Sequence, residues 1–151
     1  DVYKRQKAMF AGDVDAMNEY MNRVALQTFS YFDTGDRASG AEPERFYHGF
    51  VLGLIAEQTD IYEIRSNRES GFGRYDVMMI PKKRDNCYPA VIIEFKVHNA
   101  IKEANLEASV KAAKKQIEEK NYDAELFARG FCKEEILHYG FAFEGKKVLI
   151  G

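Results

Sequence analysis

Apolar residues recur at three- and four-residue steps in the first third of the chain, a spacing typical of amphipathic helices. The first such pattern follows Asp13, which we expect to cap the helix, and it runs to Phe32. A second pattern begins at Pro43, a residue suited to a first helical turn, and extends to about Gln58. Apolar residues surround most of this second helix, so we expect other elements to bury it. The intervening segment 33–41 contains glycine and serine and predicts a turn-rich connection.

In the middle of the chain the pattern changes to the alternation that is typical of strands. Residues 61–67 and 74–80 are expected to pair as a hairpin around a glycine-containing turn at 68–73. Pro81 ends the second of these strands. The run 88–97 is the most strand-like segment, because β-branched residues occupy its centre.

The last third of the chain is expected to form two helices and two short strands, over about 100–120, 122–129, 137–143 and 146–150. The long helix has a narrow apolar stripe and many charged residues, so one face should pack and the rest should meet solvent. The predicted order is two helices, three strands, two helices and two strands. This order indicates an α/β domain with a mixed sheet and helices packed on it.

The composition is that of a single globular domain. The chain has 151 residues and is 46% apolar, which is enough to bury a core without a disulfide or a structural metal. Aromatic residues make up 13% and there are only 3 prolines, which excludes a disordered or collagen-like chain. The formal net charge of −2 excludes nucleic-acid binding through bulk positive charge, so any such contact must be local.

The sequence also carries information on location and domain boundaries. Cys87 and Cys132 form no metal or redox spacing, which favours a reduced, cytoplasmic setting. No apolar run approaches the ~18 residues that cross a bilayer, so we expect no membrane contact. We divide the chain into a leader unrelated to the remainder of the chain (1–6), an N-terminal helix with a connecting loop (7–40) and the main domain (41–151). We also expect an upstream part of a larger protein to be missing.

Charged residues interrupt the most apolar strand. The three residues 91–93 indicate a strand buried on both faces, yet Glu94 and Lys96 continue it. Because side chains alternate along a strand, these two share one face and Phe95 points into the core on the other. Unpaired buried charges are costly. This charged edge is therefore either a functional site or an ion pair between positions i and i+2 at a strand end.

A further acidic residue, Asp76, stands in the returning strand of the predicted hairpin, where valine or threonine would be usual. If that strand lies beside 88–97, Asp76 approaches Glu94 on one face. Two close carboxylates raise each other's pKa unless a cation lies between them. Mg²⁺ suits such a place, because it takes one or two carboxylates, a backbone carbonyl such as that of Phe95, and several waters. Lys96 would then position the attacking water and stabilise charge on a phosphate.

Asp76, followed after 17 residues by Glu94-Phe95-Lys96, resembles the signature of the PD-(D/E)XK nuclease superfamily, an Asp on one strand and (D/E)-X-K on the next. More narrowly, residues 41–150 resemble the nuclease-like domain found C-terminal to AAA-ATPase-like modules in many bacteria. The phrases that carry this resemblance are 46–50, 62–71, 73–76, 93–96 and 139–143. Tyr75 stands where the superfamily name has proline, a position that only shapes the backbone before the Asp.

The resemblance implies a restriction-endonuclease-like core, with a mixed, largely antiparallel sheet flanked by helices. It also implies a hydrolase that cleaves phosphodiester bonds of DNA with Mg²⁺ or Mn²⁺. Asp76 and Glu94 would bind the metal, and Lys96 would serve the water or the transition state. Glu44 and Gln116 match polar residues that many members carry on the preceding and following helices, and both would support catalysis.

Each supporting residue also has a simpler interpretation. Glu44 would complement the N-terminus of its helix. His48, one turn later on the same face, would be a hydrogen-bonded structural histidine. Gln116 would hydrogen-bond Lys96 or a water of the metal, or else it would face solvent.

Contacts to nucleic acid are expected from a few placed cations, namely Arg65, Arg68 and Arg74 around the hairpin turn and Lys114 on the long helix. The lysines at positions 102, 111 and 115 are further candidates. For each of these residues taken singly, a solvated surface side chain is the simpler interpretation.

The sequence contains no G-x-x-x-x-G-K-[ST] motif, so an ATPase module would be an upstream partner outside this chain. Two alternatives to a nuclease stay open. The domain could be a catalytically inactive module that binds nucleic acid or regulates an attached ATPase. It could also be a structural fragment of a toxin, defence or mobile-element protein. The trio Asp76, Glu94 and Lys96 favours the enzyme, because a pure binding domain does not need it.

Overall fold

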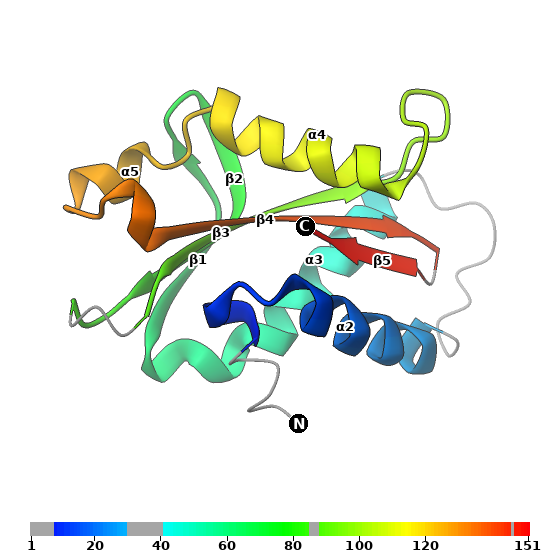
Figure 1. Cartoon of the computed structure of the whole chain (residues 1–151), viewed down its shortest axis with the longest axis horizontal. Coiled ribbons are helices and arrows are strands. Elements are labelled where there is room, and N and C mark those ends of the chain that lie inside the picture. Colours follow the sequence, from blue (N-terminus) through cyan, green and yellow to red (C-terminus); the bar gives the residue numbers. More distant parts are fainter. Residues whose placement is uncertain (1–7, 30–40, 85–87, 146) are drawn as a thin grey trace.

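The computed structural model describes residues 8–29, 41–84, 88–145 and 147–151 (Figure 1). The predicted leader 1–6 and most of the predicted connection 33–41 lie outside these ranges. The division into a leader, an N-terminal helix with its loop and a main domain therefore stays a prediction.

A five-stranded sheet forms the centre of the fold. Its strands lie in sequence order, each beside the next. All neighbouring pairs are antiparallel except β3 and β4, which are parallel. The strands are β1 (Tyr62–Ser70), β2 (Gly73–Pro81), β3 (Ala90–Val97), β4 (Ile136–Glu144) and β5 (Lys147–Ile150). The predicted fold class, an α/β domain with a mixed and largely antiparallel sheet, is confirmed.

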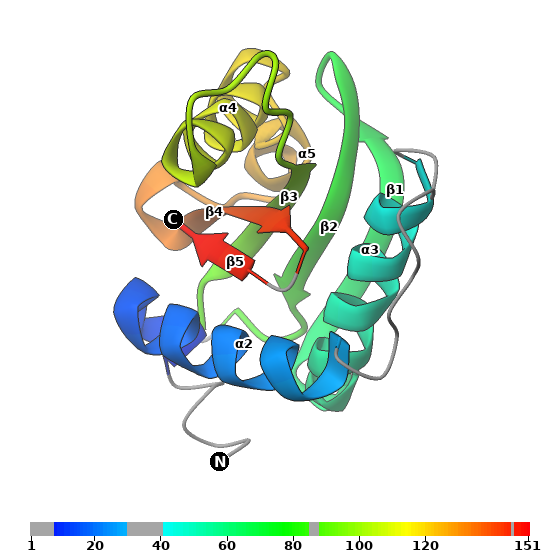
Figure 2. The same cartoon turned by 90° about the vertical axis from the view of Figure 1, so that its right-hand side faces the viewer.

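Helices cover both faces of this sheet (Figures 1 and 2). One face carries α2 (Val14–Phe29) and α3 (Ala41–Ile55), and the other carries α4 (Leu106–Glu119) and the short α5 (Ala124–Ala128). Two short 3₁₀ segments, Ala56–Asp60 and Lys133–Glu135, and a helical turn over residues 8–11 complete the described structure. None of the described helices is both long and apolar enough to pass through a bilayer.

Separate apolar cores lie on the two faces. Alternate residues of β3 point to opposite sides, so Val91, Ile93 and Phe95 join the core under α2 and α3. Ala90 and Ile92 join the core under α4 and α5. Both faces of β3 are therefore buried, as its continuous run of apolar residues predicts.

The connection from β3 to β4 passes through α4, which packs closely on β4. A Cβ atom at Gly140 would lie 2.7 Å from the backbone oxygen of Val110. Only glycine permits this approach, because a larger residue would push the helix away from the sheet. Gly140 pairs with Glu94 in the parallel ladder, so the close approach brings α4 over the charged end of β3.

Two predicted boundaries were wrong. The long helix begins at Leu106 instead of near residue 100, because asparagine side chains hold the segment before it in turns. Asn99 Oδ1 accepts from the amides of Ile101 and Lys102 at 3.0 and 3.3 Å. Asn105 caps the helix by accepting from the amide of Ala108 at 2.9 Å.

The hairpin turn is also tighter than predicted. Ser70 pairs with Gly73, which leaves only Gly71 and Phe72 in the loop. Gly71 has a φ of 60°, the left-handed conformation that such a two-residue turn requires of its first residue. A Cβ there would also lie 2.2 Å from the backbone oxygen of Asn121, so the hairpin tip packs directly on the end of α4.

The edge strand β5 is paired with side chains of α2 on its outer edge. Asn18 donates to the carbonyl of Ile150 at 2.8 Å and accepts from its amide at 2.7 Å. Asn22, one helical turn later, makes the same two bonds with Val148, at 2.7 and 3.0 Å. These carboxamides satisfy the backbone groups that an edge strand would otherwise leave unpaired.

We predict that the double variant Asn18→Ala/Asn22→Ala loses about 2–4 kcal/mol of unfolding free energy, because four backbone hydrogen bonds disappear and their partners stay partly buried. Urea unfolding followed by circular dichroism measures the loss. Glu19→Ala, an exposed position on the same helix, is the control and should change stability by less than about 0.5 kcal/mol. Equal stability of the double variant and the control would show that α2 does not hold β5.

Candidate active site

The candidate site begins where strands β2 and β3 part. Their ladder runs from Met79 with Val91 to Val77 with Ile93, and the next position would pair Asp76 with Glu94. No such pair forms among the described strands.

The carboxylate of Asp76 takes the place of the missing ladder bond. Its Oδ2 accepts a hydrogen bond from the backbone amide of Phe95 at 2.7 Å. On its other side, the register of β1 with β2 skips the position that would pair Asp76 with Asn67, and Asn67 has a φ of 52°. Neither neighbouring strand pairs with β2 at its acidic residue, Asp76.

Glu94 lies on the face of β3 that α4 covers, and it is only 5% exposed. Gln116 of α4 donates from Nε2 to its Oε1 at 3.0 Å. The other carboxylate oxygen, Oε2, is buried and has no hydrogen-bond partner among the described residues. Phe95 points to the opposite core, so the predicted alternation along the strand is correct. Gln116 bonds Glu94 rather than Lys96, which differs from the partner we expected.

Tyr122 also belongs to this hydrogen-bond network, although the sequence did not indicate it as a site residue. Its hydroxyl donates to the backbone oxygen of Arg74 at 2.8 Å and accepts from Gln116 Nε2 at 3.2 Å. Both N–H groups of the Gln116 amide are thereby engaged, which fixes the nitrogen toward Glu94. A tyrosine just after a helix reads as a core residue, and no sequence pattern distinguishes one whose hydroxyl supports a buried glutamine.

Burial dominates the electrostatics of the two carboxylates. It raises the pKa of Asp76, although the amide of Phe95 opposes the rise by stabilising the ionised form. Burial, with the nearby charge of Asp76 as the next cause, raises the pKa of Glu94 to about 9. Lys96 lowers both pKa values by its positive charge but does not cancel the effect of burial. The raised pKa favours the protonated form of Glu94 at neutral pH unless a cation lies beside the pair.

A surface pocket of about 970 Å³ opens beside Glu94. Glu94, Lys96 and Gln116 line its inner part, and the loop between β3 and α4 lines its rim. Lys96 is partly exposed there, on the same face of β3 as Glu94. Glu94 and Lys96 thus line the same pocket.

The histidine of α3 lies on the other side of the sheet. His48 Nε2 is 2.8 Å from Ser66 Oγ, and its ring lies 5.1 Å from the ring of Phe95. It is a hydrogen-bonded histidine, as the simpler interpretation expected, and its proximity opposes the rise in the pKa of Asp76. Glu44 belongs to α3 one turn earlier, but its side chain lies outside the described part of the structure.

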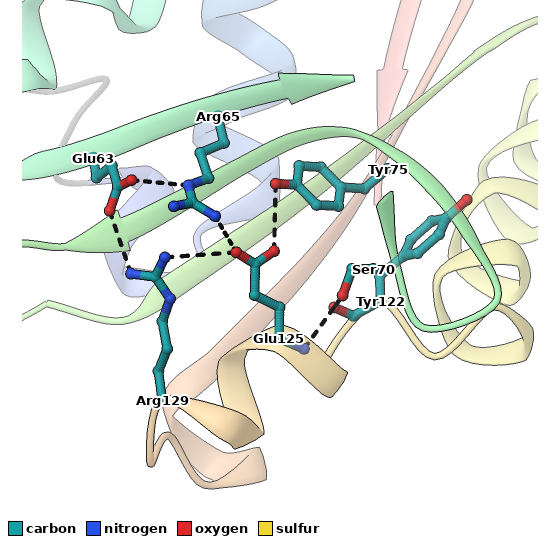
Figure 3. Close-up of polar contacts among 7 residues, drawn as sticks. All are labelled: Glu63, Arg65, Ser70, Tyr75, Tyr122, Glu125 and Arg129. Carbon is teal, nitrogen blue, oxygen red and sulfur yellow. Dashed lines mark hydrogen bonds and ion pairs between the residues drawn. The ribbon is translucent and has the colours of Figure 1, made fainter. Parts of the chain in front are cut away.

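Arg65 takes part in an ion-pair network that joins the edge strand β1 to α5 (Figure 3). Its guanidinium bonds Glu63 at 2.8 Å and also bonds Glu125 of α5. Arg129 contacts the same two carboxylates, at 3.3 and 3.6 Å. Glu63 and Glu125 together balance Arg65 and Arg129, and Arg65 is only 21% exposed, so these ion pairs disfavour a phosphate contact at Arg65.

The remaining predicted cations lie in different places. Arg68 and Arg74 are exposed near the hairpin turn, and no ion pair involves them within the described ranges. Lys114 is exposed as well, but it lines a separate hollow with Val110 on the other flank of α4 from Gln116. Lys102 instead lines the pocket beside Glu94. Of the two lysines, Lys102 is the one beside the site.

The side chains of the candidate site meet part of the requirement for binding a hard divalent cation. The partly buried Asp76 lies near the buried Glu94, and Glu94 Oε2 lacks any protein donor in the described structure. No group of three or more His, Cys, Asp or Glu side chains suited to a metal occurs among the described residues. Mg²⁺ needs only one or two carboxylates and keeps several waters, so the pair meets its requirement.

The sheet, its helices and the site together have the restriction-endonuclease-like fold. The family model of the PD-(D/E)XK nuclease superfamily matches residues 42–151. The chain belongs to this superfamily, which indicates a nuclease. Comparison with curated proteins and with solved structures found no match.

We predict that Glu94→Gln stabilises the metal-free protein at alkaline pH. The folded-state pKa of Glu94 is raised to about 9 from an ordinary 4.5, so the wild type loses stability as pH rises between these values. The variant lacks this loss and should be more stable by roughly 1–3 kcal/mol at pH 8 and about equal at pH 4. Urea unfolding in EDTA measures the difference, with exposed Glu118→Gln as the control. Parallel pH profiles of variant and wild type would contradict the prediction.

We predict that Tyr122→Phe weakens Mn²⁺ binding by about tenfold without unfolding the protein, because loosening Gln116 frees the orientation of Glu94. Calorimetric titration with Mn²⁺ measures the affinity. Tyr75→Phe is the matched control, because its hydroxyl faces Glu125 at 3.5 Å, away from the carboxylate pair. Unchanged Mn²⁺ affinity in Tyr122→Phe would remove this residue from the site.

Proposed function

We propose that this domain is a Mg²⁺- or Mn²⁺-dependent nuclease that hydrolyses phosphodiester bonds of DNA. One observation carries the proposal: the partly buried Asp76 and the buried Glu94 interact across neighbouring strands, and Glu94 lines an open pocket together with Lys96. Membership of the superfamily supports the same reaction class.

Asp76 and Glu94 would hold the metal, with the backbone carbonyl of Phe95 as a further ligand. When bound, the cation would supply a counter-charge to the carboxylates and Lewis-acid polarisation of the scissile phosphate. Lys96 would position the attacking water and stabilise negative charge that develops on the phosphate. Gln116 holds Glu94 through Oε1 and leaves Oε2 available. Glu44 stays a candidate for an additional acidic ligand.

The alternative is an inactive module that keeps the fold to bind nucleic acid or regulate an attached ATPase. The raised pKa values argue against it, because a buried pair of carboxylates lowers stability unless it binds something. A module without catalysis would be more stable with neutral residues at both positions.

Binding to DNA would depend on local charge, since the whole chain carries a net charge of −2. Lys96 and Lys102 at the pocket and Arg68 and Arg74 near the hairpin are the cations that could contact phosphates. We further propose that the domain works in the cytoplasm, C-terminal to an AAA-ATPase-like module of the full-length protein.

We predict that Asp76→Asn abolishes cleavage and reduces Mn²⁺ affinity, because it removes one ligand and the charge that attracts the metal. Cleavage is measured on labelled single-stranded, duplex and branched DNA and on RNA, with Mg²⁺ or Mn²⁺. Asp15→Asn on the exposed side of α2 controls for the substitution itself. The catalytic proposal fails if the wild type leaves every substrate intact, or if Asp76→Asn cleaves as fast as the wild type.

A further inference from the structure

An isoleucine stands fully in solvent beside the candidate site. Ile101 is 96% exposed, the largest exposed fraction among the large apolar residues described as exposed. Single exposed apolar residues are common and need no explanation. Ile101, however, lines the same pocket as Glu94 and Lys96. Its position in a pocket that also contains charged side chains is the reason to look for a function.

The loop that carries Ile101 is held by its own side chains. Asn99 Oδ1 accepts from the amide of Ile101 at 3.0 Å, and Glu103 Oε1 accepts from the amide of Asn99 at 2.9 Å. The amide of Glu103 returns a bond to the carbonyl of Asn99 at 2.8 Å. These hydrogen bonds link the two ends of the short loop 99–103 to each other. The isoleucine therefore projects from a backbone that is held in place.

A histidine anchors the base of this loop. His98 follows β3, and its amide donates to the carbonyl of Phe143 at 2.8 Å. Its ring Nδ1 lies 2.8 Å from the hydroxyl of Ser109, a fully buried residue of α4. The loop is thus tied to both β4 and α4. A contact made by Ile101 would need little ordering of the loop.

The surroundings of Ile101 define the chemistry of its ligand. Lys102 follows it and lines the pocket, and Lys96 lies further in. The pocket therefore offers two ammonium groups for anionic oxygens and one branched apolar side chain for a flat apolar surface. A nucleotide joins both features, since it carries a phosphate and a base with two apolar faces.

We propose that Ile101 packs against an unstacked nucleobase of the substrate while Lys102 contacts the adjoining phosphate. This inference rests on the proposed nuclease function and adds a substrate class to it. Bases inside a duplex are stacked on both faces and offer no surface to the isoleucine, whereas single strands and frayed or branched ends do. The domain then binds single-stranded DNA and unpaired ends in preference to continuous duplex.

The test uses the full chain without divalent metal, so that binding is measured apart from cleavage. Fluorescence anisotropy gives the affinity for a labelled single strand and for the blunt duplex of the same sequence. Ile101→Ala should weaken single-strand binding by about tenfold and change duplex binding by less than about twofold. Leu26→Ala, an exposed apolar residue of α2 away from the pocket, should leave both affinities unchanged.

Other results overturn the inference. Equal losses of single-strand and duplex binding would mean that the loop does not distinguish bases. If Ile101→Ala binds single strands as tightly as the wild type, the isoleucine does not contact a nucleobase. It would then contact another partner, such as a protein. Cleavage assays separate the two proposals. If the protein binds single strands through Ile101 but never cleaves DNA, the proposed nuclease function is wrong. If it cleaves DNA and Ile101→Ala has no effect, only this inference is wrong.

Discussion

The candidate site depends on one hydrogen bond, which the backbone amide of Phe95 donates to the carboxylate of Asp76. A side chain here replaces the carbonyl of a neighbouring strand, so the sheet can open between β2 and β3 without leaving that amide unsatisfied. Because the strands separate there, the carboxylates of Asp76 and Glu94 can lie close together.

The packing around the opening orients the groups inside it. Gly140 allows α4 to approach the sheet, and the helix then delivers Gln116 to Glu94. Tyr122, just beyond the C-terminal end of the helix, bonds that glutamine and joins it to the backbone of β2. The carboxylates are therefore held in fixed positions, and they repel each other unless a proton or a cation is bound between them.

The N-terminal helix is joined to the domain more closely than a separate segment would be. The superfamily match begins at residue 42, after α2. Nevertheless, Asn18 and Asn22 complete the backbone bonds of β5, and α2 contributes Met17 and Met21 to the core beneath the sheet. A helix that closes an edge strand also prevents the pairing of that edge with another chain.

The sequence by itself determined the order of helices and strands and the charged positions on β3, because periodicity and alternation are local properties. It could not place the start of α4, where the side chains of Asn99 and Asn105 compete with the helix for backbone bonds. Nor could it separate Arg65, which pairs with two glutamates, from arginines that stay free for a ligand. The partner of Gln116, the role of Tyr122 and the position of Ile101 beside the pocket are contacts between distant segments. Only the tertiary structure decides these, since they depend on how closely α4 packs on the sheet.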